Sequence, residues 1–495
     1  MEKQMQQKNA LSYDLIILGG GSGGLTAARL ARSLGARTLL VEKERLGGEC
    51  LHSGCVPSKS LIHVAHLLHQ ARQVQRFSRK VDTFAVDLVP LAAYLQEVIE
   101  QVRETERPFL EGVSVQFGHA TFLSSTMVRL NGTVFTGRAV VIATGSRPDV
   151  PAIAGLTDID FLTNETVFDL TTLPASLAII GGGPIGVELG QAFARLGSQV
   201  TLLQRATRLL PREDPDVSAA IAGALQADGV SIFLQTRVLR VSKQGKDCVL
   251  TIQQDQQERE ITVSAVLLAT GRQPNVESLH LEAAGVIANT QVIVVDRFLR
   301  TSAPTIYAIG DVIGGYHFSH LAAAQAATAV RNALVPFAAR PRDERVLPWC
   351  IFTDPEAGRV GLLPDEASHR YRQVRVVTLP FTEIDRAQTD EATAGFLKLV
   401  LAGKREKIVG AHLVGSHAGE LLGELALAMR HRLPLSVLLS TIHPYPTFST
   451  GLQQLAFQAY LEGDRARHDR TVVQTWLALR RWFARLLSRS SERKE

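Results

Sequence analysis

Cysteine is scarce in this sequence, with four in 495 residues. Four are too few for the disulfide scaffold of a secreted protein. Long apolar runs are missing too, because no stretch approaches the ~20 apolar residues of a membrane-spanning helix. The polar start, residues 1–12, lacks the apolar core of a secretory signal. We therefore expect a cytoplasmic protein that begins with a polar arm over residues 1–12.

Length and composition predict several globular domains. With 45% apolar and 20% charged residues, the chain has the composition of a folded protein, which excludes disorder throughout. At about 100 to 200 residues per domain, the length predicts three or four domains.

Two segments of the chain repeat one pattern. Residues 13–42 indicate a buried strand, a glycine turn, an Ala/Leu-rich helix and a second strand, and residues 175–204 show the same order. The glycines occupy matching positions, and a different side chain ends each second strand. The first copy has Gly19, Gly21 and Gly24, then Glu42 and Lys43; the second has Gly181, Gly183 and Gly186, then Gln204, Arg205 and Arg208. Two different nucleotides are therefore predicted.

Each glycine turn opens a helix, so its backbone amides can bind a pyrophosphate. Glu42 is placed to accept hydrogen bonds from ribose hydroxyls. Gln204 is neutral, and Arg205, helped by Arg208, could pair with a ribose 2′-phosphate, which favours NADPH over NADH. The alternative is that these arginines are solvated loop charges.

Cys50 and Cys55 lie in GGECLHSGCVPSK, residues 47–59. Their spacing is too long for a thioredoxin-type C-x-x-C, and two further ligands for a tetrahedral zinc site are missing. Four nearby histidines leave a metal site as the alternative; they are His52, His63, His66 and His69. A helix begins after Cys55 and would stabilise a thiolate there, so we favour a redox-active dithiol beside a flavin and no metal.

These motifs together resemble those of the class I pyridine nucleotide-disulfide oxidoreductases, such as dihydrolipoyl dehydrogenase, glutathione reductase and mercuric reductase. The resemblance covers about residues 12–460, with A-T-G-x-x-P twice (143–148 and 269–274) and Y-A-I-G-D at 307–311. It implies an α/β fold with two Rossmann-like three-layer domains, a C-terminal α+β dimerisation domain, bound FAD and a homodimer. The implied boundaries are 13–155 and 273–343 for FAD, 156–272 for NAD(P)H, 344–463 for dimerisation and 464–495 for a basic amphipathic tail.

The resemblance also implies roles for single residues. Cys55 would contact the flavin, and Cys50 would attack the substrate. Lys59 and Glu188 would form a pair where flavin and nicotinamide meet, and Asp311 would contact the flavin ribitol. The remaining implied cofactor contacts are Lys43, Gly48, Thr144, Gly145, Gly271 and Gly310.

The C-terminal domain departs from the disulfide reductases of this family. Their H-P-T-x-x-E carries the acid/base histidine, whereas this chain has Tyr445 and Thr450 at the two key positions. With an ordinary pKa near 10, a tyrosine is a poor base at neutral pH. The pattern around Tyr445 is similar to that of mercuric reductase, but the vicinal C-terminal cysteines and the N-terminal metal-binding domain of that enzyme are not found. We hypothesise that His443 replaces the missing base; the alternative is a packing histidine.

We therefore expect NADPH to reduce FAD, then the Cys50–Cys55 disulfide, and then a disulfide or thiol-bound acceptor, either a small molecule or a protein. Two alternatives remain: a mercuric-reductase-like metal ion reductase, and an electron-transfer flavoprotein attached to a membrane surface by its tail.

The net charge of +5 comes from the C-terminal tail. Residues 464–495 contain nine Lys/Arg and four Asp/Glu, and the rest of the chain has equal numbers of both, so we expect no nucleic-acid partner. Apolar residues recur at helical spacing in the tail, with Arg481, Arg485 and Arg489 off their stripe. They are Val472, Trp476, Leu479, Phe483 and Leu486. Such a helix suits the anionic inner face of a membrane, or it packs on its own dimer.

Overall fold

The apolar run after the polar arm forms strand β1 (Leu11–Leu18), which pairs in parallel with β2 (Thr38–Glu42) and β6 (Thr133–Ile142). They belong to a seven-stranded sheet of order β3-β2-β1-β6-β5-β4, with β16 paired to β6. The other strands of this sheet are β3 (Ser114–Phe117), β4 (Ala120–Phe122), β5 (Met127–Leu130) and β16 (Ile306–Ala308). Helices α2 (Ser22–Ser33) and α8 (Ser319–Leu334) cover one of its faces through alanines such as Ala27 and Ala326.

A second parallel sheet, of order β10-β9-β8-β14, carries the second glycine turn. Its strands are β8 (Ser176–Ile180), β9 (Gln199–Leu203), β10 (Ser231–Phe233) and β14 (Ala265–Leu268), and its helices are α6 (Pro184–Leu196) and α7 (Pro215–Ala227). An antiparallel sheet of three strands adjoins it: β11 (Arg237–Gln244), β12 (Asp247–Gln254) and β13 (Gln257–Val263). Two short strands lie where the chain passes from one parallel sheet to the other. Strand β7 (Ser146–Pro148) follows β6, β15 (Arg272–Pro274) follows β14, and the two pair with each other.

The cysteine segment forms helices. The short α3 (Gly48–His52) carries Cys50, and α4 (Cys55–Val74) begins at Cys55. Helix α4 packs against α6 and against α5 (Leu88–Glu106), so one helix joins the surroundings of both glycine turns.

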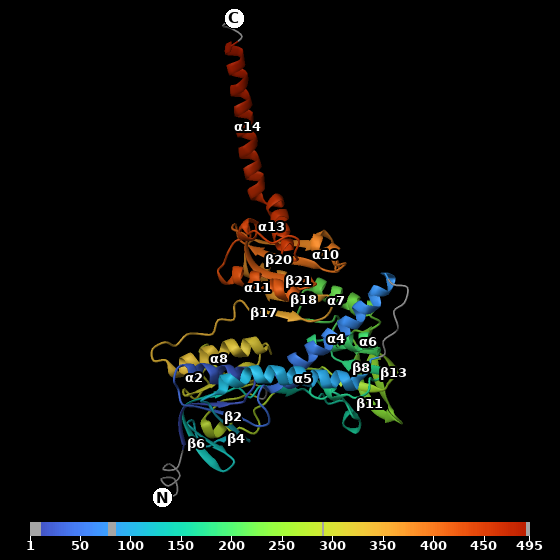
Figure 1. Cartoon of the computed structure of the whole chain (residues 1–495), viewed down its shortest axis with the longest axis vertical. Coiled ribbons are helices and arrows are strands. Elements are labelled where there is room, and N and C mark those ends of the chain that lie inside the picture. Colours follow the sequence, from blue (N-terminus) through green and yellow to red (C-terminus); the bar gives the residue numbers. More distant parts are fainter. Residues whose placement is uncertain (1–10, 78–85, 290–291, 492–495) are drawn as a thin grey trace. The chain divides into compact units, whose positions relative to one another are not determined.

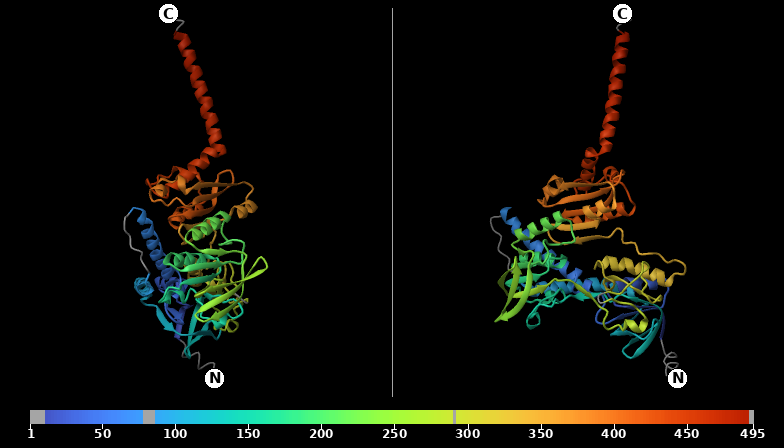
Figure 2. Two further views of the ribbon diagram at one scale, coloured as in Figure 1. Left: turned by 90° about the vertical axis from the view of Figure 1, so that its right-hand side faces the viewer. Right: turned by 180° about the vertical axis from the view of Figure 1, so that it is seen from behind.

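The C-terminal unit is built on an antiparallel sheet of order β17-β18-β21-β20-β19. Its strands are β17 (Pro348–Ile351), β18 (Glu356–Gly361), β19 (Val374–Pro380), β20 (Phe396–Ala402) and β21 (Lys407–Gly415). Its helices are α9 (Pro364–Arg370), α10 (Asp385–Thr389), α11 (Ala418–Arg430), α12 (Ser436–Ser440), α13 (Thr450–Glu462) and α14 (Asp464–Ser491). Leu399, Leu413 and Leu425 lie in its core. Helix α14, red in Figure 1, extends beyond the rest of this unit, and the views of Figure 2 show the same.

This computed structural model describes residues 11–77, 86–289 and 292–491, in two units, Met1–Glu344 and Arg345–Glu495. The predicted fold class, two Rossmann-like parts and a C-terminal α+β domain, is confirmed. Of the predicted polar arm, residues 1–10 lie outside the described residues, and Leu11 and Ser12 belong to β1. Residues 492–495 of the tail are also outside them.

Candidate functional site

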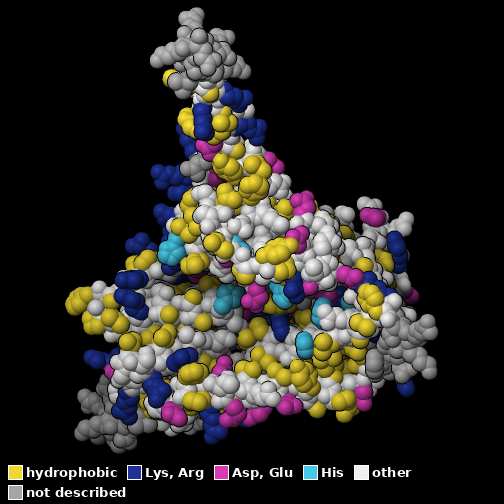
Figure 3. Space-filling view, turned by 45° about the horizontal axis from the view of Figure 1, so that its top comes forward, with side chains coloured by type: hydrophobic (Ala, Val, Ile, Leu, Met, Phe, Trp, Pro, Cys, Tyr) yellow, Lys and Arg dark blue, Asp and Glu magenta, His cyan; other side chains and the backbone are white. Residues whose placement is uncertain are grey.

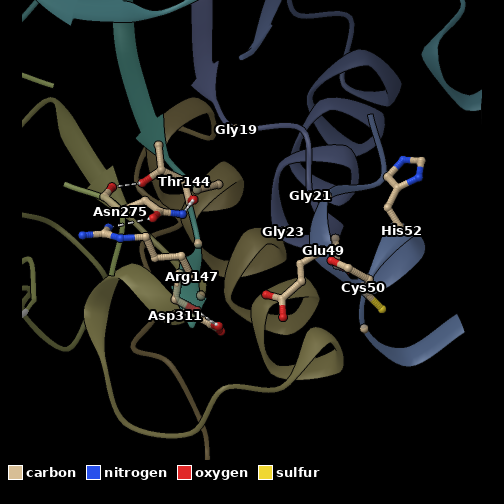
Figure 4. A pocket seen from close by; sticks show the side chains of 18 of the residues that line it. Gly19, Gly21, Gly23, Glu49, Cys50, His52, Thr144, Arg147, Asn275 and Asp311 are labelled. Carbon is tan, nitrogen blue, oxygen red and sulfur yellow. Dashed lines mark hydrogen bonds between the residues drawn. The ribbon is translucent and has the colours of Figure 1, made fainter. Parts of the chain in front are cut away.

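A cavity of about 770 Å³ lies in the first unit, where the first glycine turn meets the cysteine helices (Figure 4). It collects residues from segments that are far apart in the sequence. The predicted residues that line it are Gly19, Gly21, Glu42, Lys43, Gly48, Cys50, Cys55, Lys59, Thr144, Gly145, Glu188, Gly310 and Asp311. Such a cavity has the size and the mixed lining expected of a cofactor site.

The first glycine turn is shaped for a close ligand. A Cβ atom on Gly24 would lie 1.8 Å from the Gly19 carbonyl oxygen, so only glycine lets α2 begin this close to β1. A Cβ on Gly21 would meet only the Gly48 Cα, at 3.8 Å, which leaves room for a group at the N-terminus of α2. Backbone amides and the helix dipole both favour an anion there, so the turn fits the pyrophosphate of a dinucleotide.

Glu42 braces the same turn. Its Oε2 accepts a hydrogen bond from the Gly20 amide at 2.6 Å, and its Oε1 accepts one from the Glu44 amide at 2.9 Å. A carboxylate has about four acceptor positions, so two stay available for ribose hydroxyls. Glu42 therefore fits the role predicted for it and also holds the turn in place.

The two cysteines form a hydrogen-bonded pair of free thiols. The hydrogen bond from Cys55 lowers the pKa of Cys50 to about 6, and the same bond, with burial, raises the pKa of Cys55. Ser319, at the start of α8, places its Oγ 3.9 Å from the Cys55 Sγ. The pair therefore holds one negative charge at neutral pH, and the start of α4 at Cys55 favours that charge on either sulfur.

Lys59 lies one turn beyond Cys55 on α4 and pairs with Glu188 of α6. The Lys59 Nζ is 2.8 Å from the Glu188 Oε2, and only 7% of the Glu188 side chain is exposed. A carboxylate buried this deeply requires a cationic partner. The structure thus brings together the two residues that the resemblance paired.

Glu49 and Arg272 were missed by the sequence analysis. Arg272 pairs with Glu49, and its Nε donates to the Ser146 Oγ at 2.8 Å. Asn164 donates to the Glu49 Oε1 at 2.6 Å, and the Arg272 Nε lies 3.5 Å from the Asp311 Oδ2. Burial raises the pKa of Glu49 although Arg272 acts against it. Figure 4 shows the Glu49 side chain pointing into the cavity, next to Cys50 in sequence. The only signals in the sequence were its place before Cys50 and the arginine after the second A-T-G.

Beside the first turn, Thr144 is fixed by Asn275. The Thr144 Oγ1 donates to the Asn275 carbonyl at 2.7 Å, and the Asn275 Nδ2 donates to the Thr144 carbonyl at 3.0 Å. His317 also lines the cavity, and burial lowers the pKa of its ring. These contacts make a rigid wall beside Asp311.

The second glycine turn repeats the first. A Cβ on Gly186 would lie 2.0 Å from the Gly181 carbonyl oxygen, and one on Gly183 would meet nothing within 4 Å. Gly271, after β14, has φ +141°, in the region that favours glycine. The turn therefore fits a second pyrophosphate at the N-terminus of α6.

The arginines beside this turn differ in orientation. The Arg205 side chain is exposed. The Arg208 Nη2 instead donates to the Pro211 carbonyl at 3.0 Å, and Gln204 donates to the Arg208 carbonyl at 3.5 Å. Arg205 is therefore better placed than Arg208 to meet a phosphate.

In the C-terminal unit, His443 is held on both sides of its ring. Its Nδ1 lies 3.0 Å from the Thr441 carbonyl oxygen and its Nε2 lies 3.1 Å from the Glu424 Oε1. Both ring nitrogens are engaged by oxygen atoms of the same unit, which fixes the orientation of the ring. These contacts favour the alternative of a packing histidine over a replacement base.

Tyr445 is 73% exposed, and its hydroxyl donates to the Asp385 Oδ2 at 2.8 Å. That hydrogen bond and the charge of Asp385 raise the pKa of Tyr445. The tyrosine is thus a proton donor, and its basic, deprotonated form is even less available than that of an unperturbed tyrosine.

Two of the histidines near the cysteines contact other groups. The His52 Nε2 bonds the Leu46 carbonyl oxygen at 2.7 Å, and the His69 Nδ1 lies 3.4 Å from the Asp228 Oδ1. Within the ranges that the structure describes, no three His, Cys, Asp or Glu side chains are grouped to hold a metal ion.

Comparison with known proteins gives two family matches. The model described as pyridine nucleotide-disulphide oxidoreductase matches residues 13–331, and its dimerisation domain matches residues 347–456. Mercuric reductase of Staphylococcus aureus is 35% identical over 448 residues, 90% of this chain and 82% of that protein. Dihydrolipoyl dehydrogenase of Bacillus subtilis is 32% identical over 468 residues, 91% of this chain and 98% of that protein.

A solved structure is similar over the same range. The HOCl-induced flavoprotein disulfide reductase RclA of Escherichia coli aligns with a TM-score of 0.81 and 32% identity, covering 90% of this chain and 99% of that one.

Proposed function

Because the chain belongs to the pyridine nucleotide-disulphide oxidoreductase family, we propose that it passes two electrons from NADPH to a disulfide or thiol-bound acceptor through the Cys50–Cys55 pair. The protein is an oxidoreductase that uses FAD and a nicotinamide nucleotide, and its dimerisation domain supports a homodimer. The hydrogen-bonded pair of Cys50 and Cys55, which lines the cavity beside the first glycine turn, carries the proposal.

A thiolate is the species that attacks a disulfide, and a cysteine with a pKa of about 6 is mostly thiolate at pH 7. Cys50 therefore needs no histidine base for the attack. The departing thiol receives no such help, so acceptors whose thiols have a low pKa would react fastest. The low pKa of Cys50 thus compensates for the loss of the family histidine, whose place Tyr445 takes.

In the proposed cycle the reduced Cys50 attacks the acceptor, R–S–S–R, forms a mixed disulfide and releases one thiol. Cys55 then attacks the Cys50 sulfur, releases the second thiol and restores the Cys50–Cys55 disulfide. FAD, when bound, supplies the transfer of two electrons from the nicotinamide to that disulfide. The balance is NADPH, one proton and one disulfide giving NADP⁺ and two thiols.

The first glycine turn would hold the FAD pyrophosphate, and Glu42 the adenosine ribose. Lys43, Gly48, Thr144, Gly145 and Gly310 would line the rest of the cofactor, with Asp311 at the ribitol. The Lys59–Glu188 pair would lie where the flavin meets the nicotinamide. Gly181, Gly183, Gly186 and Gly271 would hold the second nucleotide, and Arg205 its 2′-phosphate.

Anaerobic reductive titration with NADPH tests the dithiol. Wild-type protein should take up twice the reducing equivalents of Cys50→Ser, with a long-wavelength band from a thiolate beside the flavin. Cys248→Ser is the matched control, because Cys248 is buried in β12 away from the cavity. Equal uptake by wild type and Cys50→Ser would show that the pair is not redox-active.

A second candidate is reduction of a soft metal ion. Mercuric reductases are 35% identical to this chain, and Tyr445 lies in a pattern similar to theirs. Paired thiolates bind Hg(II) well, and NADPH would reduce it to elemental mercury with release of one proton. NADPH oxidation that depends on Hg(II) and yields mercury vapour would favour this candidate; oxidation that depends only on disulfides would favour the first.

If NADPH reduces the flavin but neither acceptor turns over, an electron-transfer flavoprotein at a membrane surface becomes the better description. We place the enzyme in the cytoplasm, where thiols are kept reduced.

A further inference from the structure

Helix α14 has one end fixed and a long exposed remainder. Ala466 is buried, and the Tyr460 hydroxyl of α13 donates to the Asp469 Oδ2 at 2.7 Å, which fixes the first turns. The described side chains after them are all exposed, and each of the large apolar ones is at least 36% exposed. They are Val472, Val473, Trp476, Leu477, Leu479, Trp482 and Phe483. No described helix is both long and apolar enough to cross a bilayer.

Four of these seven apolar side chains lie on one side of α14, and Val473, Leu477 and Trp482 lie off that side. At about 100° per residue, Val472, Trp476, Leu479 and Phe483 fall within about 60° of the helix circumference, while Arg470 and Arg481 lie nearly opposite. Arg480 lies at the border, with its guanidinium 5.3 Å from the centre of the Trp476 ring. Figure 3 shows hydrophobic and basic side chains along the described part of the helix.

The charges of α14 indicate whether its apolar face binds a second copy of the helix or a lipid bilayer. From Arg470 to Ser491 the sequence has five arginines and no acidic residue. A second copy of the helix would bring arginines near arginines without an acidic partner, which disfavours a helix pair. Phosphate groups at the surface of an anionic bilayer would complement the same charges.

The aromatic side chains favour the same occupant. Trp476 and Trp482 are tryptophans, which are enriched at the boundary between lipid headgroups and acyl chains. There the ring is buried among the chains and the indole N–H is hydrated. Arginine can extend its charged end to the phosphates while its methylene groups cover apolar surface. The Arg480 guanidinium lies over the Trp476 ring, at the border of the apolar face.

We propose that α14 docks parallel to the surface of an anionic phospholipid bilayer, with its apolar face in the acyl boundary and its arginines at the phosphates. The helix lies on such a surface without crossing it. This docking is independent of the acceptor that the dithiol reduces.

Vesicle sedimentation of full-length holoenzyme tests the docking. Vesicles of phosphatidylcholine with phosphatidylglycerol should bind the protein at least tenfold better than vesicles of phosphatidylcholine alone, and salt should weaken the binding. Two of the three tryptophans are in α14 and the third, Trp349, is buried, so lipid should shift the tryptophan emission to the blue.

Trp476→Ala/Phe483→Ala and Arg480→Glu/Arg481→Glu should each lower the bound fraction at least tenfold. Arg370→Glu/Arg372→Glu, the same change of charge on exposed side chains near α9, should leave it unchanged. All variants should keep the oligomeric state and flavin content of wild type. Absent binding, equal binding to both vesicles, or equal loss in the control would overturn the proposal. So would a smaller oligomer without lipid in Trp476→Ala/Phe483→Ala, because a second copy would then occupy the face.

Discussion

The two glycine turns of this molecule have the same backbone conformation and differ in the residue at the end of the strand that follows, Glu42 in β2 and Gln204 directly after β9. In both turns a Cβ on the third glycine would lie within about 2 Å of the carbonyl oxygen of the first, 1.8 Å at Gly24 and 2.0 Å at Gly186. Glu42 accepts hydrogen bonds from the amide of Gly20 in its turn and from that of Glu44, whereas Gln204 donates to the carbonyl of Arg208. The backbone thus supplies a pyrophosphate site twice, and the residue after it adapts each site to a different nucleotide.

The surroundings differ as well. The first turn faces a cavity that Cys50, Cys55 and the Lys59–Glu188 pair also line. The second turn has at its edge an exposed Arg205. Both regions are suited to bind a nucleotide, but the cysteine pair proposed to transfer electrons lies only beside the first.

The largest effects should come from filling the space at the third glycine. Gly24→Ala should abolish FAD binding, because the new Cβ forces α2 from β1 at a cost of about 3 kcal/mol. Gly186→Ala should keep FAD and lose reduction by NADPH, while dithionite still reduces the flavin. Flavin absorbance and anaerobic reduction measure both. Gly223→Ala in α7, where a Cβ meets nothing within 4 Å, is the control and should behave as wild type. Full FAD content in Gly24→Ala would show that FAD binding does not require the close approach of α2 to β1.

The cysteine pair gives the first region a titration that the second lacks. With the pKa of Cys50 at about 6, alkylation of the reduced enzyme by iodoacetamide should rise about tenfold from pH 5 to pH 7 and then level off. Cys55→Ala removes the hydrogen bond that holds this pKa down, so the rise should move to higher pH. Burial raises the pKa of Cys248, which should stay unreactive. A rate in wild type that still climbs steeply above pH 7 would contradict the assignment.

A smaller effect is expected at Arg205. Arg205→Ala should raise the KM for NADPH about tenfold, or about 1.4 kcal/mol, and leave that for NADH unchanged, because only NADPH carries the 2′-phosphate. Steady-state kinetics with both nucleotides measure this. Arg208→Ala should matter less, since Arg208 is bound to the Pro211 carbonyl. An equal change for both nucleotides would show that Arg205 does not read the phosphate.

The sequence predicted those parts of the site that depend on local spacing. The glycine turns, the start of α4 at Cys55 and the exposed tail helix follow from neighbouring residues. The Lys59–Glu188 pair came from resemblance. The Glu49–Arg272 pair joins residues 223 apart, one in α3 and one in β15, which no local pattern reports. The contacts of His443 with Glu424 and of Arg208 with Pro211 likewise depend on how loops close. The roles of the site residues and the domain boundaries stay predictions.

The smallest effect should come from giving the first turn the side chain of the second. Glu42→Gln replaces one carboxylate oxygen by an NH₂ group, which cannot accept from the amide of Gly20 or Glu44, so one of the two hydrogen bonds is lost. The cost is about 1 kcal/mol, and FAD should bind about fivefold more weakly in equilibrium titration of the apoprotein. Gln204→Glu is the reciprocal change: its new charge would repel a 2′-phosphate and shift the preference from NADPH toward NADH, with FAD binding unchanged. If Glu42→Gln binds FAD as wild type does, the carboxylate does not distinguish the two turns. The difference between them would then rest only on Arg205 beside the second turn and on Cys50 and Cys55 beside the first.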